Sequence, residues 1–252
     1  MQTAPQYLEH GEGTLLAFCR TDGTLPEVVF LGGFRSDMTG AKALRLEEHC
    51  RGEGRAFTRF DYRGHGASSG RFEDGAVSDW LADTLAVLDR VVAGRPCVLV
   101  GSSMGGWLAL LAALARPGQV RALVGLAAAP DFTEELVRAR LNPEQAEALA
   151  RDGLFLAPST YGDPVPITRR LLDDGADHLV MRGTIPLRIP VHLLHGQEDP
   201  DVPWQTSLRL AARLESGAVT VELVKDGDHR LSREEDLRRI VAALERVTAQ
   251  LA

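Results

Sequence analysis

The stretch CVLVGSSMGG, residues 97–106, decides the fold of this 252-residue chain. It begins with an apolar run of strand character, and an apolar helical run over 104–115 follows the first glycine. Between them GSSMG, residues 101–105, fits the pattern G-x-S-x-G of a nucleophile elbow. A serine in such a tight turn is exposed only if the residues two positions away on each side are small. Ser103 meets this requirement, whereas Ser102 does not, because Val100 and Met104 flank it at those positions.

Outward from this turn, short apolar strands alternate with helical patterns along most of the chain. We expect strands at residues 15–19, 28–31, 56–60, 97–100, 122–126, 191–194 and 219–224. Strands that alternate with helices predict an α/β protein with a mostly parallel central sheet and helices on both faces.

Residues 131–188 interrupt the alternation, since they contain no convincing strand but several helix signals. Asp131 with Glu134, and Asn142 with Gln145, have the spacing of capping boxes, and a third helical run ends at Gly175. A structureless loop of this length would be implausible in a compact domain. We predict a small helical cap at 131–188, inserted into a core made of residues 1–130 and 189–252. Caps of this kind shape substrate pockets.

A serine hydroxyl is a weak nucleophile, so it needs a base, and the base needs an orienting acid. The last two expected strands are each followed by a loop that is rich in acidic residues. His229 lies in a polar, glycine-containing loop after the last strand and is the best candidate for the base. Four carboxylates compete for the role of the acid: Glu198, Asp199, Asp201 and Asp228.

Attack on a carbonyl places negative charge on its oxygen, and stabilising that charge is usually the largest catalytic effect. We expect one donor to be the backbone N–H of Met104, the residue after the nucleophile. By position, the second is the backbone N–H of Phe34, in the loop after strand 28–31. Its neighbour Arg35 is a candidate for binding a carboxylate or phosphate of a substrate. The alternative is a structural ion pair of Arg35 with Asp37 or another acid near the pocket rim.

Three motifs together carry a resemblance: LGGFRSDMTG at 31–40, FDYRGHG at 60–66 and GSSMGGW at 101–107. With them the chain resembles the α/β-hydrolase superfamily over nearly its whole length. More narrowly, it resembles the branch of the mitochondrial palmitoyl-protein thioesterase, also described as mycophenolic acid acyl-glucuronide esterase. The chain departs from many relatives at Gly32-Gly33, where they have His-Gly. This departure removes a side-chain brace but leaves the backbone donor in place.

The resemblance implies the α/β-hydrolase fold and a catalytic triad. The superfamily pattern H-G-x-x-D-x-x-V-P matches residues 195–203 and selects Asp199 as the acid, with Asp201 as the alternative. The implied triad is therefore Ser103, Asp199 and His229. Three of the remaining histidines are interpreted as structural: His65, His192 and His195.

The resemblance further implies hydrolysis of a carboxylic ester or thioester of an acyl substrate through an acyl-enzyme intermediate. The substrate would be a small molecule or an S-acylated protein, as in depalmitoylation, and the reaction would need no metal or organic cofactor. The same fold also serves other functions. A ligand receptor that keeps the triad but turns over slowly, a peptidase and a carbon–carbon bond hydrolase therefore stay open.

Composition narrows the possible partners and the compartment. The net charge of −7 lacks the basic character of a nucleic-acid-binding protein. Cys19, Cys50 and Cys97 are isolated from one another, which suits a reducing compartment. No secretory signal is visible, and no segment has the roughly 18 apolar residues that a membrane span requires. We therefore expect a cytoplasmic bacterial protein without stable membrane insertion.

Overall fold

An eight-stranded sheet forms the centre of the structure. The computed structural model describes residues 4–11, 13–158 and 163–251. The strand order is β1-β2-β4-β3-β5-β6-β9-β10; the β1–β2 and β2–β4 pairs are antiparallel, and all other neighbouring pairs are parallel. The strands are β1 Gln6–His10, β2 Thr14–Thr21, β3 Thr24–Leu31, β4 Arg55–Phe60, β5 Cys97–Ser102, β6 Val120–Leu126, β9 Val191–Gly196 and β10 Val219–Val224.

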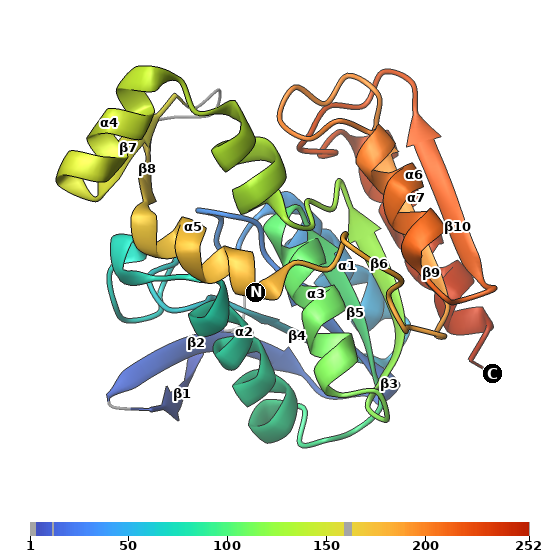
Figure 1. Ribbon diagram of the computed structural model, residues 1–252. Coiled ribbons are helices and arrows are strands. Elements are labelled where there is room, and N and C mark those ends of the chain that lie inside the picture. The colour runs from blue at the N-terminus through green and yellow to red at the C-terminus, as the bar shows by residue number, and fades with distance from the viewer. Residues whose placement is uncertain (1–3, 12, 159–162, 252) are drawn as a thin grey trace.

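Helices cover both faces of this sheet (Figure 1). Helices α1 (Ala41–Gly52) and α7 (Glu234–Ala249) pack together on one face. Helices α2 (Val77–Ala86), α3 (Met104–Ala115) and α6 (Gln205–Arg213) pack on the other. The mostly parallel sheet between two helical layers confirms the predicted fold class.

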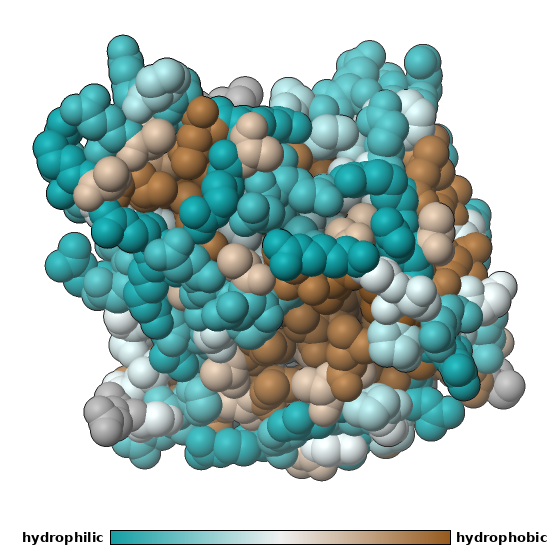
Figure 2. All heavy atoms as spheres, in the orientation of Figure 1, coloured by the Kyte–Doolittle hydropathy of each residue, from teal (hydrophilic) through white to brown (hydrophobic). Residues whose placement is uncertain are grey.

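Apolar packing holds the layers together. Helix α3 is apolar on nearly all sides, and its Trp107 is fully buried in the larger core cluster, to which Trp80 of α2 also belongs. Apolar side chains also reach the surface around α3 (Figure 2). No helix within the described residues is long and apolar enough to cross a membrane.

All seven expected strands are present, and the described residues form three further strands that were not expected. Strand β1 lies at the edge of the sheet, where its pattern of exposed polar residues gave no clear signal. The other two, β7 (Leu154–Ala157) and β8 (Val165–Thr168), form an antiparallel pair. The prediction that residues 131–188 contain no strand is therefore wrong.

Between β6 and β9 the chain contains short helical turns at Thr133–Val137, Arg138–Arg140 and Ala176–His178. It also contains helices α4 (Pro143–Asp152) and α5 (Arg169–Gly175). Together with β7 and β8 they lie above the sheet at the upper left of Figure 1.

The two predicted capping boxes in this segment have different outcomes. Asn142 accepts a hydrogen bond from the Gln145 N–H at 2.8 Å, and the Gln145 side chain accepts one from the Asn142 N–H at 3.1 Å, as predicted. The Asp131 carboxylate instead accepts the N–H groups of Val180 at 2.9 Å and Met181 at 2.8 Å, at the far end of the segment. The prediction for Asp131 is wrong because a long-range contact takes its carboxylate.

Candidate active site

Ser103 occupies the turn between β5 and α3 with backbone angles φ +53° and ψ −119°. A positive φ is uncommon for a residue with a side chain and marks local strain. Hydrogen bonds hold the strained turn. The Ser103 N–H donates to the Leu126 carbonyl at 2.9 Å, and the Ser103 carbonyl accepts from the N–H groups of Gly106 at 2.9 Å and Ala129 at 3.1 Å.

The two glycines of the elbow pattern are required for close packing. A Cβ atom on Gly105 would lie 2.2 Å from the carbonyl oxygen of Leu31. A Cβ atom on Gly101 would lie 2.3 Å from the carbonyl oxygen of Gly105. Because these neighbours are backbone atoms, they cannot rotate away. This is the steric reason why the residues two positions from Ser103 are small.

The structure brings together the three residues of the expected triad from the ends of β5, β9 and β10. The Nε2 atom of His229 lies 3.1 Å from the Ser103 Oγ, and its Nδ1 atom lies 2.7 Å from the Asp199 Oδ2. A carboxylate only accepts hydrogen bonds, so Nδ1 carries the proton and the Nε2 lone pair faces the serine hydroxyl. This arrangement can remove the hydroxyl proton of Ser103 during nucleophilic attack.

Asp199 is fully buried and accepts four hydrogen bonds. The Oδ1 atom accepts the N–H groups of Asp201 and Val202, each at 2.8 Å, and the Oδ2 atom accepts from His229 and His195. Burial alone would raise the pKa of Asp199, but the hydrogen bonds from the two histidines lower it well below its ordinary value. The carboxylate is therefore ionised and can stabilise a charged His229.

His195 lies on β9 and was interpreted only as structural, but it contacts the acid directly. Its Nε2 atom lies 3.1 Å from both the Asp199 Oδ2 and the Val202 carbonyl, so that nitrogen must be the protonated one. Its Nδ1 atom accepts from the Ser207 hydroxyl at 2.7 Å. His195 therefore orients the Asp199 carboxylate, and its place in the H-G-x-x-D pattern was the available signal.

The other candidate acids have different surroundings. Glu198 is exposed, and Asp228 accepts the Leu231 N–H at 2.8 Å within its own loop. Asp201 lies near the triad, because carboxylate oxygens of Asp201 and Asp199 and a ring nitrogen of His229 lie within 4.8 Å of one another. Such a cluster could in principle hold a cation, but the 2.7 Å hydrogen bond between Asp199 and His229 would first have to break.

The expected oxyanion donors lie on either side of the nucleophile. Met104 is the first residue of α3, and Phe34 belongs to a turn after β3 that lies close to the elbow. A Cβ atom on Gly33 would lie 3.4 Å from the Ser103 Cβ, so this turn contacts the nucleophile. Within the described ranges, the N–H groups of Phe34 and Met104 donate to no other group. Neither N–H group is therefore committed to another acceptor in these ranges.

Arg35 makes different contacts from those that were considered. Its Nη1 atom donates to the carbonyls of Asp163 at 3.4 Å and Pro164 at 3.2 Å, just before β8. Its guanidinium lies 5.8 Å from the centre of the Phe72 ring. In the part of the chain that the structure describes, no carboxylate pairs with Arg35, so the proposed ion pair with Asp37 does not form. Arg35 joins the turn after β3 to the segment above the sheet.

A cavity of about 410 Å³ opens beside Ser103 and His229. Its wall includes three basic residues, Arg35, Lys42 and Arg230, and one acid, Asp37, so basic groups outnumber acidic ones there. Burial, helped by the nearby charge of Arg230, lowers the pKa of Lys42 to about 8. The Lys42 ammonium donates to the Arg230 carbonyl, directly after the histidine of the triad. Lys42 could not be found from the sequence, because α1 reaches the cavity only through the fold.

Comparisons with known proteins show the family of this chain. The model of the alpha/beta hydrolase family matches residues 28–243. The mouse mitochondrial palmitoyl-protein thioesterase ABHD10 is 39% identical over 248 residues, covering 98% of this chain and 83% of the mouse protein. A crystal structure of a hydrolase from Agrobacterium vitis S4 has a TM-score of 0.91 and 41% identity, with 98% of each chain covered. The structure of alpha/beta hydrolase domain-containing protein 10 from mouse also has a TM-score of 0.91, with 37% identity, covering 99% of this chain and 100% of the mouse chain.

These matches confirm the resemblance found in the three sequence motifs. The family match includes the elbow, the acid loop and the loop of His229. This chain therefore belongs to the alpha/beta hydrolase family.

Proposed function

We propose that the protein is a serine hydrolase that cleaves an ester or thioester bond of an acyl substrate. The observation that carries the proposal is the continuous hydrogen-bonded chain from the Ser103 hydroxyl through His229 to the buried Asp199. The name of the mouse relative, a palmitoyl-protein thioesterase, supports an acyl thioester as one substrate class.

In the proposed mechanism, Ser103 attacks the acyl carbonyl while His229 takes its proton. The backbone N–H groups of Phe34 and Met104 stabilise the oxyanion, and Asp199 stabilises the charged imidazole. His229 then protonates the leaving alcohol or thiol, which departs and leaves an acyl group on Ser103. A water molecule, activated by the same histidine, hydrolyses this acyl-enzyme.

We propose that residues 131–188 act as a cap that selects the acyl group. Apolar side chains of this segment, including Phe155 and Ile167, form a cluster against which Phe34 of the oxyanion turn packs. An acyl chain held at this cluster would begin next to the reacting carbonyl. Apolar surroundings of this kind stabilise a hydrocarbon chain.

The decisive experiment compares wild type with Ser103→Ala on p-nitrophenyl esters of increasing chain length, acyl-CoA thioesters and acyl glucuronides. We expect the substitution to lower kcat by roughly 10⁶, the scale seen when such a nucleophile is removed. An enzyme should be labelled by a fluorophosphonate at Ser103 and should hydrolyse many ester molecules per active site. Labelling together with only one slow ester turnover would favour a ligand receptor, and unchanged ester turnover by Ser103→Ala would refute the proposal.

Arg35 has two proposed roles that one variant separates. If Arg35 binds an anionic substrate group, Arg35→Ala should raise KM for charged esters but not for neutral ones. If it only joins the turn to the cap, as its bonds to the carbonyls of Asp163 and Pro164 favour, both KM values should change equally. Steady-state kinetics on a neutral ester and its carboxylate-bearing analogue make the comparison.

We also propose a cytoplasmic location in a bacterium. The three cysteines are buried, and their spacing suits a reducing compartment. The mouse relative is described as mitochondrial, so fractionation of the source organism is the direct test.

A further inference from the structure

The RGHG motif has no part in the proposed chemistry, yet its histidine contacts the oxyanion turn. His65 follows β4 and is only 4% exposed. The backbone N–H of Arg35 donates to the His65 Nε2 atom at 3.2 Å. Arg35 is the residue directly after Phe34, whose N–H is the proposed oxyanion donor.

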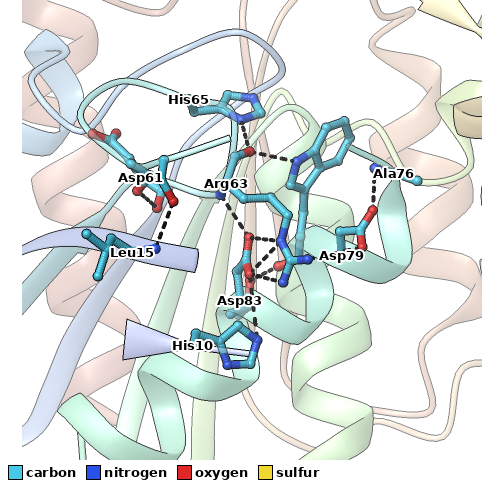
Figure 3. A network of polar contacts seen from close by, with 12 residues as sticks. His10, Leu15, Asp61, Arg63, His65, Ala76, Asp79 and Asp83 are labelled. Carbon is cyan, nitrogen blue, oxygen red and sulfur yellow. Dashed lines mark hydrogen bonds and ion pairs between the residues drawn. The ribbon is translucent and has the colours of Figure 1, made fainter. Parts of the chain in front are cut away.

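The protonation state of His65 follows from its two partners. Its Nδ1 atom lies 3.2 Å from the Arg63 carbonyl, as Figure 3 shows. A carbonyl only accepts, so Nδ1 carries the proton and Nε2 keeps the lone pair that receives the Arg35 N–H. Burial, together with the charge of Arg35, lowers the pKa of His65 to about 4. The imidazole is therefore neutral near pH 7.

The turn that His65 contacts belongs to a class with two standard backbone arrangements, type I and type II. The Gly33 carbonyl accepts from the Ser36 N–H at 3.1 Å and the Ser36 hydroxyl at 2.8 Å, which closes a four-residue turn. Its third residue, Arg35, has φ +56°, the value that a type II turn requires and that favours glycine. A flip of the peptide between Phe34 and Arg35 would give the commoner type I turn and relieve Arg35. The flip would also remove the Arg35 N–H from His65.

We propose that His65 is a positioning residue for the oxyanion site: by accepting the Arg35 N–H, its imidazole fixes the peptide between Phe34 and Arg35 and thereby the backbone of the turn that carries the Phe34 N–H. This inference rests on the proposed function, because it requires Phe34 to be an oxyanion donor. The Phe34 ring is held separately by edge contacts with Phe72 and Trp80. The His65 bond fixes the adjoining backbone, which these ring contacts do not reach.

His65 is itself held by a rigid network (Figure 3). The Arg63 carbonyl that orients its ring also accepts from the Trp80 indole at 3.3 Å. The Arg63 guanidinium pairs with the buried Asp83 at 2.6 Å, and the Arg63 N–H donates to the same carboxylate at 2.8 Å. The carbonyl that faces His65 therefore has little freedom to turn away.

The test separates the acceptor atom of His65 from its ring packing. His65→Phe keeps an aromatic ring for the edge contacts with Tyr62, Phe72 and Trp80 but has no acceptor, whereas His65→Gln keeps a side-chain acceptor. We expect His65→Phe to lower kcat by about 10- to 100-fold, somewhat less than loss of an oxyanion donor itself, with KM changed less than about twofold. A trifluoromethyl ketone forms an adduct that carries an oxyanion, so its inhibition constant should rise by a similar factor. His65→Gln should recover part of both losses.

His192→Phe is the matched control, since His192 is a buried histidine near the start of β9, away from the turn. It should leave kcat and inhibitor affinity unchanged. Wild-type kcat in His65→Phe, or a loss expressed in KM alone, would overturn the inference. If His65→Phe does not fold, ¹⁵N NMR of wild type decides: a neutral Nδ1–H tautomer at pH 7 supports the inference, and an Nε2–H tautomer contradicts it. An active Ser103→Ala would instead refute the proposed function.

Discussion

The elbow at the end of β5 and the segment between β6 and β9 differ in what determines their backbone conformation. At the elbow, Gly101 and Gly105 lie so close to backbone atoms that no side chain fits. In the segment, Gly183 has no atom within 4 Å of the position of a Cβ, so its backbone tolerates other residues. A local pattern therefore specifies the elbow, whereas contacts between distant residues specify the segment.

Among the variants that compare the two regions, the largest expected effect lies in the loops of the core. Asp199→Asn should lower kcat by roughly 10⁴, because an amide cannot stabilise the charged His229 and favours the wrong tautomer. Turnover of a short p-nitrophenyl ester measures the loss. Asp201→Asn is the matched control and should cost less than tenfold. Equal losses in the two variants would contradict the assignment of Asp199 as the acid.

The next prediction tests the steric difference between the two regions. Gly105→Ala should destabilise the protein by about 3 kcal/mol or more, since the new Cβ would lie 2.2 Å from the Leu31 carbonyl oxygen. Gly183→Ala should stay within about 0.5 kcal/mol of wild type. Urea denaturation of both variants makes the comparison. Similar stabilities would show that the elbow adjusts more freely than its contacts indicate.

The stability of the core should depend on pH through His65. The pKa of His65 is lowered to about 4 in the folded protein, whereas in the unfolded chain it has its ordinary value near 6.5. The unfolded state therefore binds a proton first as the pH falls, and wild type loses stability between pH 6.5 and pH 4. Relative to His65→Phe, this loss should reach about 2 kcal/mol by pH 4.5. Parallel dependence of the two proteins on pH, measured by urea denaturation, would contradict it.

The smallest effect concerns the segment alone. Asn142→Ala removes the cap of α4 and should cost about 1 kcal/mol, without changing kcat for a short ester. Thermal unfolding should show a decrease of roughly 2–4 °C. Glu147→Ala, on the exposed side of the same helix, should change the melting temperature by less than half as much. A fall in kcat in Asn142→Ala would show that α4 is coupled to the chemistry.

The sequence predicted most of the core because its strands are apolar and its elbow is sterically constrained. The residues themselves pointed to Ser103 and His229, and the family resemblance selected Asp199 among four acids; the fold brings all three into hydrogen-bonding distance. The sequence did not predict β8, since Val165-Pro166 lacks the pattern of a strand and depends on pairing with β7. Nor did it place Lys42 at the cavity, because that position depends on where α1 packs.

The carboxylate of Asp131 accepts the N–H groups of Val180 and Met181, so these hydrogen bonds join the two ends of the segment that follows β6. Closing such a long loop costs conformational entropy, and these hydrogen bonds at its base offset part of that cost. The cost itself grows only weakly with the length of the loop. The pairing of β6 with β9 lies outside these two ends and uses none of the residues between them. Under the proposed function, the part of the chain that selects the acyl group is therefore anchored apart from the strands that carry Ser103, Asp199 and His229.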